Sequence, residues 1–190
     1  CTPEYLLQFG VMGSLYMQKI KGIANPRVGL VNNGSEDSKG DPLRKEAYAL
    51  LKAAGEAGHI NFIGNVEGRD VPLGACDVAV CDGFAGNVML KTIEGVAKFM
   101  AGAIKDVFTA NLGTKLAYLA CKKGMDDFRS LFDQDAVGGA PFIGISRPVI
   151  KAHGSSNDTA FMNAIRQAIE YKKSGMIEAI EQNVQHMTAE

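Results

Sequence analysis

Residues 78–108 constrain the fold of this chain more than any other stretch, because they join two different hydrophobic patterns. Residues 78–81 (VAVC) are a short apolar run, and residues 88–108 repeat apolar side chains at steps of three and four. The run predicts a buried strand, and the repeat predicts an amphipathic helix. Between them, residues 82–87 (DGFAGN) contain two glycines and predict a tight loop that ends near Asn87, where the helix begins.

The order of strand, loop and helix also occurs before this segment. Strands are predicted at residues 27–33 and 61–63, and helices at residues 2–21 and 41–54. This alternation is typical of an α/β fold with a largely parallel sheet and helices on both faces. Right-handed crossovers would bring three loops to the sheet edge where ligands bind in open α/β folds. These loops are residues 33–40, 64–70 and 82–87.

The second half of the chain has a looser pattern. Residues 110–137 predict short amphipathic helices broken at Gly124, which would form a protruding amphipathic helical subregion. Partly basic helices of this kind either lie on a membrane surface or pack against another subunit or the body of the protein, and the residues leave both alternatives open. Strand pieces are then predicted at residues 142–145 and 148–150, followed by two terminal helices.

The composition excludes several classes of function. The net charge of −1 and the scattered Lys and Arg residues predict no nucleic-acid partner. No apolar run approaches the roughly 20 residues that a membrane-spanning helix needs. The four cysteines form no CxxC pair and the chain has three histidines, so we expect no metal site and a reducing, cytoplasmic compartment. The chain starts at Cys1 without a methionine, which suggests a fragment whose N-terminal part is absent.

Residues 82–87 are the first candidate for a binding site. A helix N-terminus presents unpaired N–H groups and the positive end of the helix dipole, which together hold anions such as phosphate. The alternative is that Gly83 and Gly86 only permit a tight turn. The stretch matches neither the Walker loop nor the GxGxxG loop of dinucleotide-binding proteins.

Lys39 and Arg69 are two further candidates at the same sheet edge. Lys39, beside Gly40, could place an ammonium group there, or it could be a solvated loop residue. Arg69 could clamp an anion through two hydrogen bonds. It could equally pair with Glu67 or Asp70 and so hold its own loop in place.

The segment at residues 153–156 (HGSS) precedes the first of the terminal helices. It contains no G-x-S-x-G nucleophile motif, and no Ser-His-Asp order can be argued from it. Ser155 or Ser156 is more simply a helix cap, with or without contact to a ligand.

Five stretches of the chain resemble, in the same order, the bacterial phosphate acyltransferases of phospholipid synthesis. They are residues 27–32 (RVGLVN), 38–41 (SKGD), 61–70 (NFIGNVEGRD), 82–91 (DGFAGNVMLK) and 153–156 (HGSS). The resemblance covers nearly the whole chain, whereas the members of that family are much longer. Residues 1–190 are therefore identified as the C-terminal part of such a catalytic domain, and the absent part would form one wall of the cleft.

The resemblance implies a fold similar to isocitrate dehydrogenases and phosphate acetyltransferases, and a homodimer. It implies that acyl-[acyl carrier protein] and inorganic phosphate react to give acyl phosphate and free carrier protein, without a cofactor. It also implies a cytoplasmic protein with peripheral membrane contact, which residues 110–137 would make. Activity of the fragment by itself stays open.

By the same resemblance, Lys39 and Asn87 are the expected catalytic residues. Lys39 would offset the charge of the phosphate, and the Asn87 amide would donate a hydrogen bond to the phosphate or to the developing oxyanion. The residues expected to bind substrate are Gly40, Arg69, Asp82, Gly83, Phe84, Gly86, His153 and Ser155. Two other functions stay open, a non-catalytic anion-binding or dimerisation module and an NAD-dependent oxidoreductase of related fold.

Overall fold

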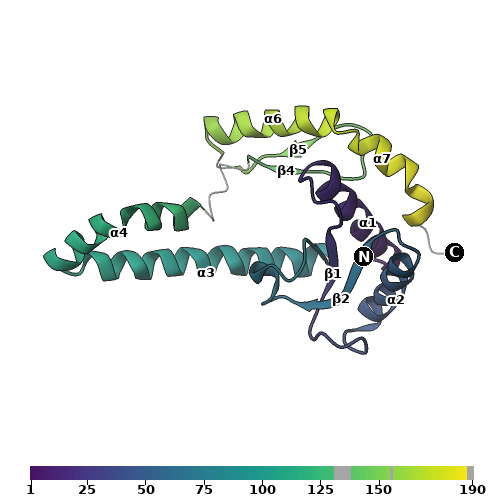
Figure 1. Cartoon of the computed structure of the whole chain (residues 1–190), viewed down its shortest axis with the longest axis horizontal. Coiled ribbons are helices and arrows are strands. Elements are labelled where there is room, and N and C mark those ends of the chain that lie inside the picture. Colours follow the sequence, from purple (N-terminus) through teal and green to yellow (C-terminus); the bar gives the residue numbers. More distant parts are fainter. Residues whose placement is uncertain (131–137, 155, 188–190) are drawn as a thin grey trace.

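A three-stranded parallel sheet forms the centre of the fold in a computed structural model, which describes residues 1–130, 138–154 and 156–187 (Figure 1). The strands are β1 (Arg27–Asn32), β2 (Asn61–Glu67) and β3 (Val78–Val80), in the order β2-β1-β3. Both β2 and β3 run parallel to β1. The predicted α/β fold, with a parallel sheet flanked by helices, is confirmed.

Strand β2 is longer than predicted, because its glycine forms a bulge instead of ending the strand. The pairing with β1 shifts by one residue after Phe62, which leaves Ile63 as the extra residue, and Gly64 has a φ of 95°. Glycine adopts this left-handed angle at little cost, so the strand continues past the bulge. Residues 64–67, which we expected in a loop, therefore belong to β2, and only residues 68–70 follow the strand.

Helices α1 (Pro3–Lys19) and α2 (Pro42–Glu56) cover one face of the sheet and contact each other. Each begins with a proline directly after a capping residue, which is the favoured order at a helix start. The side chain of Thr2 accepts a hydrogen bond from the backbone of α1, and Asp41 does so for α2. These helices form close to where the sequence predicts them.

The hydrophobic core lies between these two helices and the sheet. Its most buried members come from both layers, and they include Leu6, Val28, Leu30, Leu51 and Val80. Gly10 allows α1 to approach α2 closely, since a Cβ atom at this position would lie 2.7 Å from Cδ2 of Leu51. The glycine is therefore part of the packing and not a helix breaker.

An ion pair between Arg27 and Asp77 ties the start of β1 to the segment before β3. The Asp77 carboxylate accepts hydrogen bonds from the Arg27 backbone N–H at 2.7 Å and from its guanidinium at 2.9 and 3.0 Å. The same guanidinium donates to the carbonyl oxygens of Gly74 and Ala75. The hydrogen bonds from the Arg27 side chain are the main reason why the pKa of Asp77 falls to about 2.

This ion pair predicts a defined response of stability to acid. The folded-state pKa of Asp77 lies below the ordinary value of 3.8, so the contact stabilises the fold above about pH 4 and is lost as the pH falls toward 2. The thermal midpoint of Asp77→Asn should therefore lie below that of the unmodified chain near neutral pH, and the difference should shrink in acid. Thermal unfolding followed by circular dichroism at a series of pH values checks this. A difference that stays constant down to about pH 3 would contradict it.

Helices α3 (Gly83–Thr109) and α4 (Leu112–Ser130) lie side by side and extend away from the sheet (Figure 1). Asn111 and Thr114 exchange hydrogen bonds between the backbone N–H of each and the side-chain oxygen of the other, which closes the turn between the helices. Helix α4 runs through Gly124 without interruption, so the predicted break there is wrong. A glycine inside a helix costs only about 1 kcal/mol relative to alanine, which the rest of the helix can offset.

The C-terminal third returns to the body of the molecule. Strands β4 (Ala140–Pro141) and β5 (Ile150–Lys151) form a short antiparallel pair, so the strand pieces predicted at 142–145 and 148–150 are largely misplaced. Helix α6 (Asp158–Lys173) packs on this pair, and α7 (Met176–Gln182) packs on α1. The side chain of Asn157 caps α6, so the serines expected in this role are not the cap.

Candidate functional site

The carboxyl ends of β1 and β3 define the place where a ligand is expected. The chain leaves β1 through α2 to reach β2 on one side, and β3 then pairs on the other side of β1. Such a reversal of strand order opens a crevice at the carboxyl ends of the two strands. The N-termini of α2 and α3 follow these two strand ends, so two helix dipoles begin in this region.

Two asparagines hold the loop at residues 33–40 against the strand ends. The Asn32 side-chain amide donates to the Lys39 carbonyl oxygen at 3.2 Å and to the Asn65 side-chain oxygen at 3.1 Å. The buried Asn65 donates in turn to the carbonyl oxygen of Glu36 at 2.8 Å. This role of the two residues was not predicted, although the sequence places an asparagine at or just after the end of each of the two strands.

Gly40 has a structural reason to be glycine. Its φ is 95°, and a Cβ atom there would lie 2.8 Å from the amide of Asn32 and 2.7 Å from Cβ of Arg44. A side chain would therefore be strained and would also push the loop off the strand end. The residue shapes the start of α2 and so the edge where a ligand is expected.

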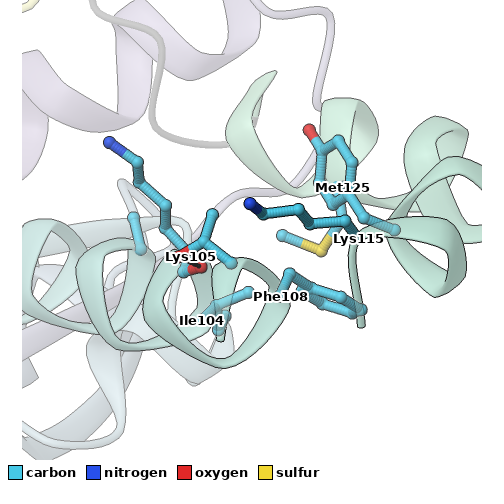
Figure 2. Close-up of a pocket in the computed structure, with 8 residues that line it drawn as sticks. Ile104, Lys105, Phe108, Lys115 and Met125 are labelled. Carbon is cyan, nitrogen blue, oxygen red and sulfur yellow. Dashed lines mark hydrogen bonds between the residues drawn. The ribbon is translucent and has the colours of Figure 1, made fainter. Parts of the chain in front are cut away.

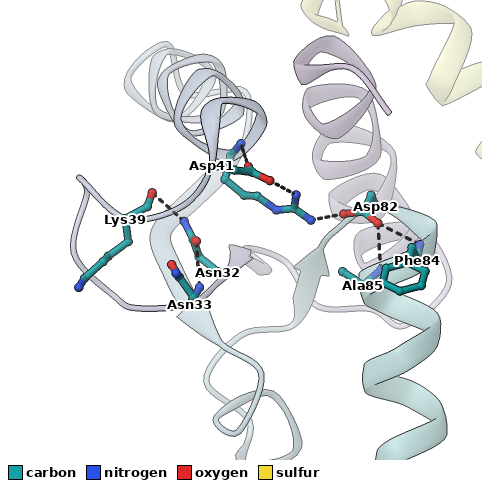
Figure 3. A network of polar contacts seen from close by, with 8 residues as sticks. Asn32, Asn33, Lys39, Asp41, Asp82, Phe84 and Ala85 are labelled. Carbon is teal, nitrogen blue, oxygen red and sulfur yellow. Dashed lines mark hydrogen bonds and ion pairs between the residues drawn. The ribbon is translucent and has the colours of Figure 1, made fainter.

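Arg44, which was not among the predicted site residues, joins the two helix starts. Its guanidinium donates to the Asp41 carboxylate at 2.7 Å and, through its other terminal nitrogen, to the Asp82 carboxylate (Figure 3). The Arg44 side chain is only 19% exposed, so this ion pair is shielded more than a surface pair. A single cation thus binds the capping aspartates of both α2 and α3.

Residues 82–87 do not form the predicted glycine loop. Asp82 is the N-cap of α3, and its Oδ1 accepts hydrogen bonds from the backbone N–H groups of Phe84 and Ala85, both at 2.9 Å (Figure 3). The helix starts at Gly83, four residues before Asn87. The carboxylate of Asp82 therefore occupies the position at the helix N-terminus that we expected a phosphate to take.

The environment of Asp82 favours its charged form. The backbone N–H of Ala85 is the main cause that holds the pKa of this carboxyl below its ordinary value, and the charge of Arg44 acts in the same direction against the effect of burial. Gly86 also has a packing role, because a Cβ atom there would lie 2.8 Å from Sγ of Cys81. The glycines of this stretch thus serve a helix start that lies close to β3.

The two expected catalytic residues do not meet in this structure. The Lys39 side chain points away from Asp82 (Figure 3), is 46% exposed, and places its ammonium 4.0 Å from the Glu36 carboxylate. Asn87 lies on an exposed part of the first turns of α3, as do Gly83 and Phe84. Of these two cations, Arg44 and not Lys39 reaches the start of α3.

The remaining candidates lie in different surroundings. Arg69 is 78% exposed and donates to the Glu67 carboxylate at 2.6 Å, which is the pairing that the sequence left as an alternative to anion binding. His153 lies between β5 and α6, and its carbonyl oxygen accepts a hydrogen bond from Ser156. Ser155 lies outside the described residues.

The residues that the structure describes contain no group of three or more His, Cys, Asp or Glu side chains that could hold a metal ion. Within the same residues, no helix combines the length and the hydropathy needed to span a membrane.

Comparisons with known proteins point to one family. The model of a family described as fatty acid synthesis protein matches residues 1–179. A phosphate acyltransferase of Brevibacillus brevis is 47% identical over 186 residues, which cover 98% of this chain and 54% of the relative. The phosphate acyltransferase of Desulfitobacterium hafniense is 48% identical over 98% of this chain and 55% of the relative. That of Acetivibrio thermocellus is 45% identical over 100% of this chain and 55% of the relative. The chain spans about half the length of these curated relatives.

Proposed function

Since this chain belongs to the fatty acid synthesis protein family, whose model matches residues 1–179, we propose that it forms part of a phosphate acyltransferase. The reaction would transfer an acyl group from acyl-[acyl carrier protein] to inorganic phosphate. The observation that carries the proposal is the identity of nearly one half with phosphate acyltransferases over almost the whole chain. The names of these relatives favour acyl transfer over the NAD-dependent oxidoreductase alternative.

The chemistry requires little from the protein beyond binding and charge stabilisation. A phosphate oxygen attacks the thioester carbonyl carbon, a C–O bond forms, the C–S bond breaks, and the thiol of the carrier protein leaves with a proton. Phosphate is already an anion at neutral pH, so no serine or cysteine nucleophile is needed. Orientation of the two substrates and donors to the developing oxyanion can supply most of the rate enhancement.

The geometry supports different roles for the residues at the sheet edge. Asp82 would position α3 and not bind phosphate, because a carboxylate repels the anion. Lys39 lies on the loop that Asn32 and Asn65 hold, and its ammonium would turn from Glu36 toward the phosphate. The exposed amide of Asn87 would donate a hydrogen bond to phosphate or oxyanion.

The other candidates would shape or line the same cleft. Gly40, Gly83 and Gly86 would shape its wall, and the exposed Phe84 would lie at its rim. Arg69, His153 and Ser155 are proposed as more distant contacts to the substrate.

The test is acyl phosphate formation from acyl-[acyl carrier protein] by this chain and by a full-length relative that carries the corresponding substitutions. Lys39→Ala and Asn87→Ala should each lower the rate more than about tenfold, because each removes a charged or polar contact to the transition state. Lys45→Ala is the matched control, since Lys45 is an exposed lysine of α2 outside the proposed site. Near-normal turnover of either variant, with an unchanged circular dichroism spectrum, would remove that residue from the mechanism.

The same assay, combined with thermal unfolding in the presence of phosphate, separates the enzyme from the binding-module alternative. If phosphate raises the thermal midpoint of this chain without any turnover, while the full-length relative is active, the fragment behaves as an anion-binding module. If neither protein forms acyl phosphate, the proposed function itself fails.

Helices α3 and α4 also support two proposed partners. No residue of α3 is buried, and large apolar side chains are exposed along both helices. They include Val96, Phe99, Val107, Leu112, Leu116 and Leu119. An exposed apolar surface of this extent favours a binding partner, and we propose that a second copy of the chain is one such partner. We also propose that the protein is cytoplasmic and makes peripheral contact with a membrane through residues 110–137.

A further inference from the structure

A cavity between α3 and α4 lies far from the sheet edge and takes no part in the proposed reaction. Its volume is about 260 Å³, and it is lined by Ala101, Ile104, Lys105, Phe108, Thr109, Lys115, Tyr118 and Met125. Ala101, the first lining residue, follows Gly83 at the start of α3 by 18 positions. At about 1.5 Å per helical residue, it therefore lies roughly 27 Å from the start of the helix. The cavity is therefore separate from the candidate phosphate site.

The walls of this cavity are apolar, and they come from both helices. Figure 2 shows Ile104 and Phe108 on α3 facing the same space as Met125 on α4. The Phe108 and Tyr118 rings meet edge to face with their centroids 5.6 Å apart, which holds the two helices at this level. The side chains of Ile104, Phe108 and Met125 present only carbon and sulfur atoms to this space. A space with such walls suits a hydrocarbon chain.

Two lysines border the cavity, one on each helix. The side chain of Lys115 extends across the space between the helices, and Lys105 extends from α3 on the same side (Figure 2). Neither ammonium makes an ion pair within the part of the chain that the structure describes, and the described lining contains no carboxylate. Two positive charges next to an apolar space, with no ion-pair partner among the described residues, favour an anionic head group.

From this combination we propose that the cavity binds one long-chain anionic amphiphile, with its hydrocarbon chain between α3 and α4 and its carboxylate or phosphate group between Lys105 and Lys115. The volume lies just below the range of about 300–1,000 Å³ that is common for ligand pockets, so it accommodates part of a single chain and not a whole lipid. The proposal does not depend on the proposed acyl transfer.

A single tryptophan provides a local signal for the test. The chain contains no tryptophan, so Tyr118→Trp would be the only one and would report on this cavity alone. Dodecyl phosphate and dodecanoate, each below the concentration at which it forms micelles, should shift the Trp emission to shorter wavelength in a saturable way. Inorganic phosphate, which lacks the chain, and dodecyl maltoside, which lacks the charge, should bind at least about tenfold more weakly. Calorimetric titration of the unmodified full chain checks that the tryptophan does not create the site.

Two sets of variants test the contacts. Lys105→Ala with Lys115→Ala should weaken binding of dodecyl phosphate at least about tenfold, whereas Lys98→Ala with Lys122→Ala should not change it, since those exposed lysines lie outside the lining. Ala101→Phe should fill the space and weaken binding of every long-chain probe. Equal weakening by both lysine pairs, or no saturation below micelle formation, would overturn the proposal. A shift that appears only with phosphatidylglycerol vesicles would also overturn it and would indicate membrane contact of the outer helix faces instead.

Discussion

Replacing Asp82 with alanine is expected to lower the free energy of unfolding by about 2–4 kcal/mol, because a helix cap and one partner of a shielded ion pair are lost together. The first loss concerns the N–H groups of Phe84 and Ala85, which both donate to Asp82 at 2.9 Å. The second concerns Arg44, which would keep Asp41 as a partner but would leave one terminal nitrogen facing an apolar methyl group. Denaturant unfolding of the unmodified chain and the variant measures the difference.

Two further variants separate these contributions. Asp82→Asn keeps an oxygen that can cap α3 and removes the charge, so it should cost less than Asp82→Ala. Arg44→Met removes the cation, and a cycle with Asp82→Ala should give a coupling energy of roughly 0.5–3 kcal/mol, as expected for residues in contact. Strict additivity of the two substitutions would show that the ion pair contributes nothing to stability.

The contribution of Asp82 should also depend on pH. Its folded-state pKa is lowered, so the stabilisation is present above the ordinary value of 3.8 and is lost as the pH falls through the lowered pKa. The difference in the free energy of unfolding between the unmodified chain and Asp82→Asn should therefore become smaller in acid.

Replacing Leu51 with alanine is expected to lower the free energy of unfolding by about 2–5 kcal/mol, the range for a buried leucine in a close-packed core. Leu51 is completely buried and lies where α2 meets α1 and the sheet. Because Gly10 approaches it closely, the loss of its methyl groups would open a cavity that rigid helices cannot fully close. Leu73→Ala is the matched control, since that leucine is 82% exposed and lies outside α3 and α4, so its loss should cost no more than about 0.5 kcal/mol.

The packing at Gly10 allows a second check of the same contact. Gly10→Ala alone should be destabilising, since the new Cβ atom would lie 2.7 Å from Cδ2 of Leu51. In the Leu51→Ala background this obstacle is absent, so Gly10→Ala should recover part of the lost stability by filling space and by raising helix propensity. If the effects of Gly10→Ala and Leu51→Ala on the free energy of unfolding simply add, the contact between the two residues would be contradicted.

Some of the fold could be predicted because it depends on residues close together in sequence. Apolar runs at residues 28–31 and 78–81 predicted two strands of a parallel sheet, and Pro3 and Pro42 after capping residues predicted two helix starts. Three of the helix and strand boundaries that the sequence misplaced lie at glycines. Gly64, Gly83 and Gly124 suggested interruptions, but they form a bulge, a capped helix start and a helix interior.

By itself the sequence determined the order of strands and helices, the parallel sheet and the family to which the chain belongs, because periodicity and short motifs depend on local residues. Only the tertiary structure decided which side chains meet at the sheet edge. Arg44 and Asp82 are 38 positions apart, and they pair because the starts of α2 and α3 lie next to each other after the chain crosses the sheet. Likewise, the start of α3 is held by its own aspartate, since the backbone conformation after β3 brings that carboxylate onto the first N–H groups.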